Sequence, residues 1–172
     1  YWAKVGDHRF AHTLDILADS LLNSLLDPAE LEKERAVILD RHAAYFEAMA
    51  ERAHSQRWHQ DKQGLDELGR EHDNLRAALD HLQSVDARRA LRLAGALGWF
   101  WHLRSHFSEG RTRLAQALAA VEARDETRAR ALAAAGEIAA WAGDLEAARP
   151  LIEEAVALWR VQGQTQEIAC AL

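Results

Sequence analysis

Apolar residues recur at helical spacing along most of the chain. A first stripe, with steps of three and four residues, consists of Leu14, Leu17, Leu21 and Leu25. A second stripe, with alternating steps of three and four, consists of Leu65, Leu68, His72, Leu75, Leu79 and Leu82. Such spacing places the members of each stripe on one face of an α-helix. We therefore predict an all-α protein.

The sequence DPAE at 27–30 marks the start of a long helix. Asp27 can cap the helix, Pro28 suits its first position and Glu30 can complete a capping box. The helical pattern then continues to about His54. Upstream, apolar residues flank the Gly6-Asp7 pair within residues 1–12, which predicts a short β-hairpin there.

Beyond residue 86 the chain repeats itself. Residues 97–117 align with residues 135–155 at a constant shift of 38, which brings Gly98 over Gly136 and Gly110 over Ala148. Each segment is typical of two helices joined by a tight turn, and stacked helix pairs form an α-solenoid. Small residues are expected where helices cross closely, with large residues beside them. The packing residues that this alignment predicts are Leu97, Gly98, Trp101, Phe107, Gly110, Leu114, Gly136, Leu145, Ala148 and Ile152.

This pattern of small and large residues resembles the tetratricopeptide repeat (TPR). Leu97-Gly98 and Ala135-Gly136 stand at the Leu-Gly position of that motif, and Trp101 stands at its first aromatic position. The resemblance implies antiparallel helix pairs stacked as a TPR-like α-solenoid.

The upstream half carries a narrower resemblance. RHAAYFEAMAERA (41–53), LGREHDNLRAALDHL (68–82) and ALRLAGALGWFWHLRSHFSEGRTRLAQAL (90–118) follow one another in this order. The order resembles the helical region of bacterial STAND-type transcription regulators, of the AfsR-like or LuxR-like kind, and DHRFAHTLDILADSLL (7–22) resembles the end of the winged-helix segment before it. The resemblance implies a sensor arm that contacts regulator domains missing from this chain. ATP is expected only on a missing upstream module, since the chain has no G-x-x-x-x-G-K-[ST] loop.

Three segments are expected on this basis. Residues 1–26 hold the end of a winged-helix-like segment, with its hairpin, and a linking helix. Residues 27–86 hold a helical pair, and residues 87–172 hold about two TPR-like repeats and the start of a third.

The composition narrows the choice of partners. The chain has 172 residues, 49% hydrophobic and 28% charged, with a formal net charge of -6, which argues against nucleic-acid binding. Cys170 is the single cysteine, so no intrachain disulfide can form and a cytoplasmic setting fits. No apolar run approaches the roughly 20 residues that cross a membrane. Because the chain begins at Tyr1 and ends within an apolar pattern, we expect it to be a fragment.

Catalytic and metal sites are not expected. His102 and His106 are four residues apart, as are His8 and His12, but zinc needs three or four ligands and His106 falls in a predicted turn. No serine stands in a G-x-S-x-G elbow. His72 is expected to make a structural hydrogen bond to another helix, because an unpartnered buried polar group costs about 1–3 kcal/mol. We therefore predict that the chain is not an enzyme.

The concave side of the solenoid is the predicted binding site, because the first helix of each pair lines it. The predicted groove residues are Arg92, Trp99, His102, Leu103, Arg130, Glu137 and Trp141. Trp and Arg often dominate binding energies, although a neighbouring helical layer could equally cover the tryptophans. The expected function is a non-catalytic interaction and sensing module of a transcription regulator that binds a protein, peptide or small inducer. The alternative is a TPR-type structural scaffold without a ligand, which self-associates through the apolar edge beyond Gln164.

Overall fold

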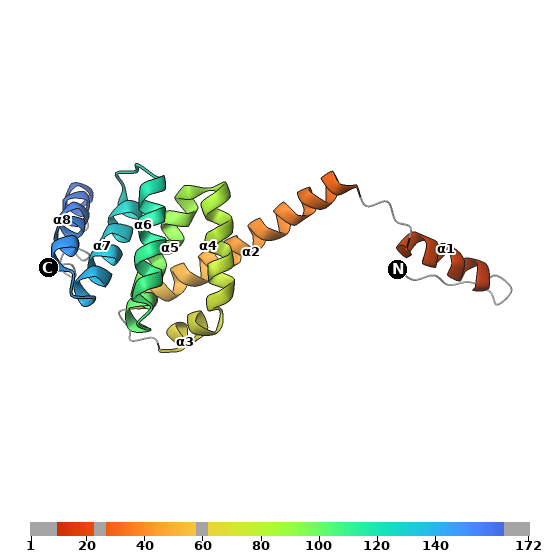
Figure 1. The fold of residues 1–172 in the computed structure, drawn as a ribbon, viewed down its shortest axis with the longest axis horizontal. Helices are drawn as coiled ribbons and strands as arrows, with labels where there is room; N and C mark the ends of the chain where they lie inside the picture. The colour runs from red at the N-terminus through yellow and green to blue at the C-terminus, as the bar shows by residue number, and fades with distance from the viewer. Residues whose placement is uncertain (1–9, 23–26, 58–61, 164–172) are drawn as a thin grey trace. The chain divides into compact units, whose positions relative to one another are not determined.

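The computed structural model describes residues 10–22, 27–57 and 62–163 (Figure 1). Every helix in these ranges is an α-helix of nine residues or more, and no strand occurs within them. The all-α prediction is therefore confirmed for the described part of the chain. None of the described helices combines the length and the low charge content needed to cross a bilayer. The chain divides into two compact units, Tyr1–Ile38 and Leu39–Leu172.

The first unit contains helix α1 (Phe10–Leu22) and the beginning of helix α2 (Pro28–Gln56). Asp27 Oδ1 accepts a hydrogen bond from the backbone N–H of Ala29 at 2.9 Å, and Pro28 is the first helical residue. The carboxylate of Glu30 pairs with Lys33 Nζ at 2.6 Å. The helix therefore begins where the sequence DPAE predicts it.

The predicted hairpin falls mostly on residues 1–9, which lie outside the described residues. Its last part is wrong, because Phe10–His12 form the first turn of α1. The physical reason is that Phe10 stands four residues before Leu14 and so extends the helical apolar stripe by one turn. Phe10 and Leu14 are 63% and 53% exposed.

The second unit starts with the remainder of α2 and continues through α3 (Lys62–Arg70) and α4 (His72–Val85). The leucine stripe from Leu65 to Leu82 suggested one helix, but a turn at Glu71 divides it into α3 and α4. The amide of Leu75 still donates to the carbonyl oxygen of Glu71 at 2.9 Å, so the break is local. His72 thereby becomes the first residue of α4.

Four more helices complete the second unit: α5 (Ala87–Leu103), α6 (Phe107–Ala120), α7 (Glu126–Trp141) and α8 (Leu145–Gln162). Three of them have an aspartate N-cap whose side chain accepts a backbone hydrogen bond: Asp86 for α5, Asp125 for α7 and Asp144 for α8. Gly163 ends α8 in the left-handed conformation, with φ of 72°. The expected third repeat, the apolar edge beyond Gln164 and Cys170 lie outside the described residues.

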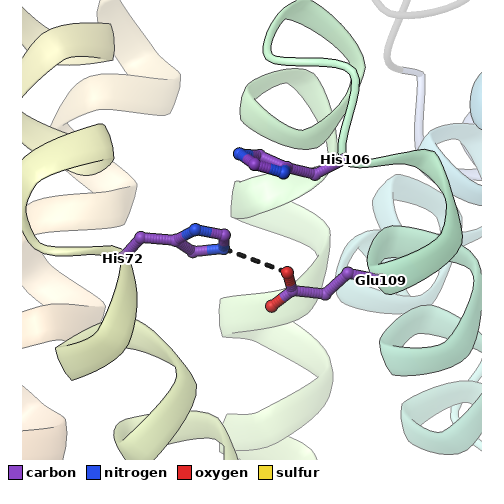
Figure 2. A group of neighbouring side chains, drawn as sticks. All are labelled: His72, His106 and Glu109. Atoms are coloured by element: carbon purple, nitrogen blue, oxygen red, sulfur yellow. Dashed lines mark ion pairs between the residues drawn. The ribbon is translucent and has the colours of Figure 1, made fainter.

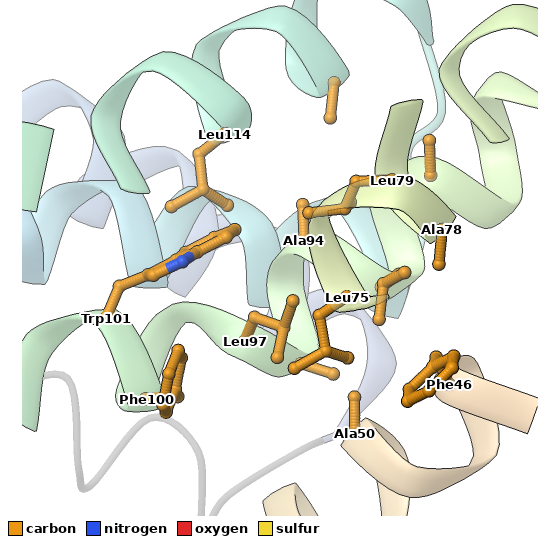
Figure 3. Close-up of a cluster of buried hydrophobic side chains, with 14 of the residues drawn as sticks. Phe46, Ala50, Leu75, Ala78, Leu79, Ala94, Leu97, Phe100, Trp101 and Leu114 are labelled. Carbon is orange, nitrogen blue, oxygen red and sulfur yellow. The ribbon is translucent and has the colours of Figure 1, made fainter. Parts of the chain in front are cut away.

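A continuous apolar core joins α2, α3, α4, α5, α6 and α7, and Figure 3 shows part of it. Its largest fully buried side chains are Trp101 and Phe100 of α5, with Leu97 beside them and Leu114 contributed by α6. A second cluster lies between α7 and α8 and consists of Ala129, Leu132, Ala133, Ala155 and Trp159. Because α5 contacts α4, α6 and α7, this helix is the centre of the described second unit.

Three glycines lie where helices approach closely. A Cβ added at Gly98 would lie 2.3 Å from Ala134 Cβ on α7. A Cβ at Gly110 would lie 2.6 Å from Ile138 Cδ1, and one at Gly136 would lie 2.5 Å from Ile152 Cγ1. These distances are too short for carbon atoms in contact, so each glycine permits a specific helix–helix approach.

The predicted packing residues fall into three groups by exposure. The buried ones are Leu97, Gly98, Trp101, Gly110, Leu114, Gly136 and Ala148, and the half-buried ones are Phe107 and Ile152. Leu145 is 69% exposed, so its expected packing role is wrong. Its counterpart Phe107 is partly covered because α7 follows α6, whereas no later helix occurs in the described residues to cover the start of α8.

Replacing Gly98 with alanine should destabilise the protein, because the added methyl group would push α5 and α7 apart. We expect Gly98→Ala to lower the free energy of unfolding by about 1–3 kcal/mol in urea denaturation. Gly69→Ala is the matched control, since the nearest heavy atom, Arg104 Nη2, lies 4.0 Å from the added Cβ. Alanine forms helix better than glycine, so the control should gain up to about 1 kcal/mol. Equal effects of the two substitutions would show that the close approach at Gly98 is not tight.

Candidate functional site

Two arginines of the predicted groove bind helix α2. Arg92 on α5 donates from Nη2 to Glu47 Oε1 at 2.7 Å. Arg130 on α7 donates from Nη1 and Nη2 to the two carboxylate oxygens of Glu51 at 2.9 and 2.7 Å. Glu47 and Glu51 are one helical turn apart, and the two arginines are related by the 38-residue shift. The arginines at equivalent positions of α5 and α7 therefore bind successive turns of α2 in the same molecule.

Glu47 is the buried charge at the centre of this contact. It is the one charged residue that is buried in the described part of the chain, with 5% of its surface exposed. Arg89 donates from Nε to Glu47 Oε2 at 2.8 Å, and its Nη2 lies 2.6 Å from the same oxygen; Arg92 binds Oε1. A buried carboxylate is tolerated only when charged, hydrogen-bonded partners surround it. We call Arg89, Arg92 and Arg130 the arginine clamp.

Trp99 and Glu137 are half-buried and do not form an open groove wall. Trp99 packs against the main core, and its indole Nε1 is buried with no hydrogen-bond partner among the described residues. Glu137 lies half-buried on α7. Four of the seven predicted groove residues are therefore not open to a ligand: Arg92 and Arg130 bind α2, and Trp99 and Glu137 are half-buried.

The other three groove residues lie at the C-terminal ends of α5 and α7, where Leu103 and Trp141 are exposed and His102 is half-buried. The rings of His102 and Trp141 lie 4.9 Å apart at an interplanar angle of 31°. Trp141 is 68% exposed and Leu103 is 56% exposed. Burial lowers the pKa of His102 below its ordinary value, which favours a neutral ring against the indole. We call His102, Leu103 and Trp141 the Trp141 surface.

A separate polar cluster joins the beginnings of α4 and α6 (Figure 2). His72 is the first residue of α4, His106 is the N-cap of α6, and Glu109 lies in the first turn of α6. Donor atoms of these three side chains all lie within 4.8 Å of one another. The rings of His72 and His106 are 4.6 Å apart, and His72 Nε2 lies 3.2 Å from Glu109 Oε2.

Burial and a neighbouring arginine shift the pKa values of two residues of the cluster. Burial lowers the pKa of His72; the charge and polar contact of Glu109 oppose this shift, and the charges of Arg76 and His106 add to it. The pKa of Glu109 is lowered chiefly by the hydrogen bonds from Arg76. Those bonds run from Arg76 Nε at 2.8 Å and from Nη2 at 2.6 Å.

Sequence reasoning predicted part of this cluster. It placed His106 in a turn and required a partner for His72 from another helix. It could not select Glu109, because 37 residues separate His72 from Glu109 and only the packing of α4 on α6 brings them together. His102 and His106 have i, i+4 spacing, but the turn after Leu103 places the two rings against different neighbours. The ring of His102 packs on Trp141, and that of His106 packs on His72.

His54 is a further histidine held neutral by the fold. Its Nδ1 is buried and has no hydrogen-bond partner among the described residues. Burial is the largest cause that lowers the pKa of His54, to about 3, followed by the positive charges of Arg57 and Arg130; a hydrogen bond to the backbone of Ala96 opposes them.

The comparisons with known proteins give one match, which lies in the N-terminal part of the chain. The family described as Insulinase (Peptidase family M16) matches residues 1–74. The match includes α1, α2, α3 and the first residues of α4, which is less than half of the 172 residues. No curated protein and no solved structure matches the chain.

This match overturns the resemblance to AfsR-like or LuxR-like regulators. Residues 7–22 and 41–53, which carried two parts of that resemblance, lie inside the segment matched by the peptidase family. The assignment to a STAND-type transcription regulator, and the sensing function taken from it, are wrong. The physical reason is that amphipathic stripes and capped helix starts are general requirements of helix packing, so they do not separate one helical family from another.

Acidification should weaken the fold through His54. The unfolded chain binds a proton at this residue below about pH 6.5, whereas the folded protein does so only near pH 3. The contribution of His54 to the free energy of unfolding is therefore fully present above pH 6.5 and is lost as the pH falls toward 3. The loss has a slope of about 1.4 kcal/mol per pH unit. We expect the stability difference between wild type and His54→Gln to shrink between pH 7 and pH 5 in urea denaturation.

The exposed His12 provides the control for this measurement. His12→Gln should follow the wild-type pH dependence, because solvent surrounds its side chain in α1. If the difference in unfolding free energy between wild type and His54→Gln stayed constant across this pH range, the result would contradict the burial of a neutral ring.

Proposed function

We propose that the chain is a helical region of an insulinase-type peptidase, and that its described residues bind peptide without cutting it. The observation that carries the proposal is the Trp141 surface, an exposed aromatic and aliphatic group in a chain whose residues 1–74 match a peptidase family. Peptides are by definition the substrates of peptidases, so a peptide is the occupant that this surface fits best.

The chemistry of the surface suits an apolar peptide segment. Trp141 presents a flat ring that packs against His102. Leu103, the residue after His102, adds an exposed aliphatic side chain. Tryptophan often dominates binding energies because it buries a large, rigid area. A neutral His102 also offers a ring nitrogen to a peptide amide without placing a charge in the contact.

The absence of cleavage motifs from the sequence supports a binding role. In the two H-x-x-x-H pairs of the sequence, neither the second nor the fourth position is glutamate, so neither the H-E-x-x-H nor the H-x-x-E-H motif is present. No G-x-S-x-G elbow is present either. Arg76 engages both oxygens of Glu109, which makes that carboxylate a poor general base.

We also propose that α5–α8 are stacked as two TPR-like pairs. Helices α6 and α8 begin 38 residues apart, at Phe107 and Leu145. The close approaches at Gly98 and Gly136 support this arrangement, since they join α5 to α7 and α7 to α8. The single cysteine fits a reducing compartment such as the cytoplasm.

Binding of an insulin-derived peptide tests the proposal, since the matched family is named for insulin. The fluorescein-labelled, reduced B chain of insulin should bind the wild-type chain in an anisotropy titration, and mass spectrometry should recover it intact. Trp141→Ala should weaken binding at least about fivefold, the effect of losing one energetically important contact residue. Val85→Ala is the control, because Val85 is also exposed, at 60%, but lies at the end of α4.

Two results would overturn the proposal. A B chain that fails to bind, or that binds equally well to Trp141→Ala, removes the Trp141 surface as a peptide site. Cleavage of the B chain by the purified wild-type chain shows that the region is itself a peptidase.

A further inference from the structure

We propose that His72, His106 and Glu109 form a binding site for a divalent transition-metal ion, with zinc as the best match. This site is separate from the Trp141 surface and does not depend on the proposed peptide binding. Two imidazoles and one carboxylate converge from the start of α4, the α5–α6 turn and the first turn of α6 (Figure 2).

The donor atoms are nearly close enough to share one ion. They lie within 4.8 Å of one another, whereas ligand atoms about 2.0–2.2 Å from a zinc ion are roughly 3.5 Å apart in a tetrahedral site. Side-chain rotations can supply this difference, because all three residues are half-buried and lie near helix ends.

The contact between His72 and Glu109 is the observation that points to a cation. Nε2 is buried and lies 3.2 Å from Glu109 Oε2, but the angle is poor for a hydrogen bond. The oxygen therefore lies off the direction in which an N–H group would point. A buried lone pair facing a carboxylate is unfavourable, and a cation between the two atoms would satisfy both of them.

Arg76 shapes the site from the outside. Its two hydrogen bonds to Glu109 leave further lone pairs on the carboxylate, which has about four. Hydrogen-bonded carboxylates are common among metal ligands because their partners fix the orientation. The positive charge of Arg76 also opposes a second cation, so it should limit the affinity.

The ligand types and the open side select the class of metal. Imidazole nitrogens favour zinc, cobalt and nickel over magnesium and calcium, which prefer oxygen ligands. A hollow of about 570 Å³ adjoins Glu109 and is lined also by Arg76, Ser108, Thr112, Arg113 and Gln116. Water from this hollow would complete the coordination of an ion held by three side chains.

Metal titration of the untagged chain tests the site. After removal of metals with EDTA, zinc should bind with one equivalent in competition with a chromophoric chelator. Cobalt should give the intense visible absorption of a tetrahedral site. His106→Gln and His72→Gln should each weaken zinc binding at least about tenfold, with circular dichroism confirming that the helices remain.

Two further variants separate a metal site from a structural hydrogen-bond network. His81→Gln, on α4 but outside the cluster, should leave zinc binding unchanged. Arg76→Gln should weaken zinc binding less than His106→Gln does, because Arg76 is not a ligand and its loss removes a competing positive charge together with a partner that orients Glu109. Zinc binding that is absent from the wild type, or that His81→Gln and His106→Gln weaken equally, would overturn the proposal.

Discussion

The buried carboxylate of Glu47, held by Arg89 and Arg92, is the interaction that fixes α2 to the rest of the second unit. A charge with this little exposure is stable only if its counter-charges are fixed in place, and both arginines stand on the central helix α5. The contact therefore sets the register of α2 against α5, and Arg130 repeats it one turn later against α7. Apolar packing of Phe46 and Ala50 completes the contact between α2 and its neighbours.

This interaction joins the part of the chain that matches the peptidase family to the part beyond it. Glu47 and Glu51 lie within residues 1–74, whereas the three arginines of the clamp come later in the sequence. The family match ends at residue 74, but the apolar core continues beyond it, because α2 and the helices that hold it share one core. The candidate sites lie on this framework: the end of α5 presents His102 and Leu103 outward, and the turn that follows brings His106 to His72.

Sequence periodicity predicted the helices well because helix formation is a local property. The start of α2 at Asp27, the close-packed glycines and most of the repeat packing residues could be placed from the sequence alone. The break at Glu71 and the exposure of Leu145 could not, because they depend on neighbouring helices. The partners of the groove arginines could not be predicted for a related reason, since the 38-residue shift paired Arg92 with Arg130 but gave no sign that α2 would supply their carboxylates. The family was misjudged because its evidence was the same helical pattern, which many proteins share.

The most direct measurement is the unfolding free energy of Glu47→Gln compared with Glu32→Gln. Glu32 is on the same helix, but its side chain is 73% exposed and its nearest arginine atom is 3.7 Å away, so its loss should cost less than about 0.5 kcal/mol. If the buried carboxylate holds α2 in place, Glu47→Gln should cost about 3 kcal/mol, because two arginines lose their shared partner. An effect of Glu47→Gln as small as that of Glu32→Gln would show that apolar packing alone positions α2, and would contradict the central role of the arginine clamp.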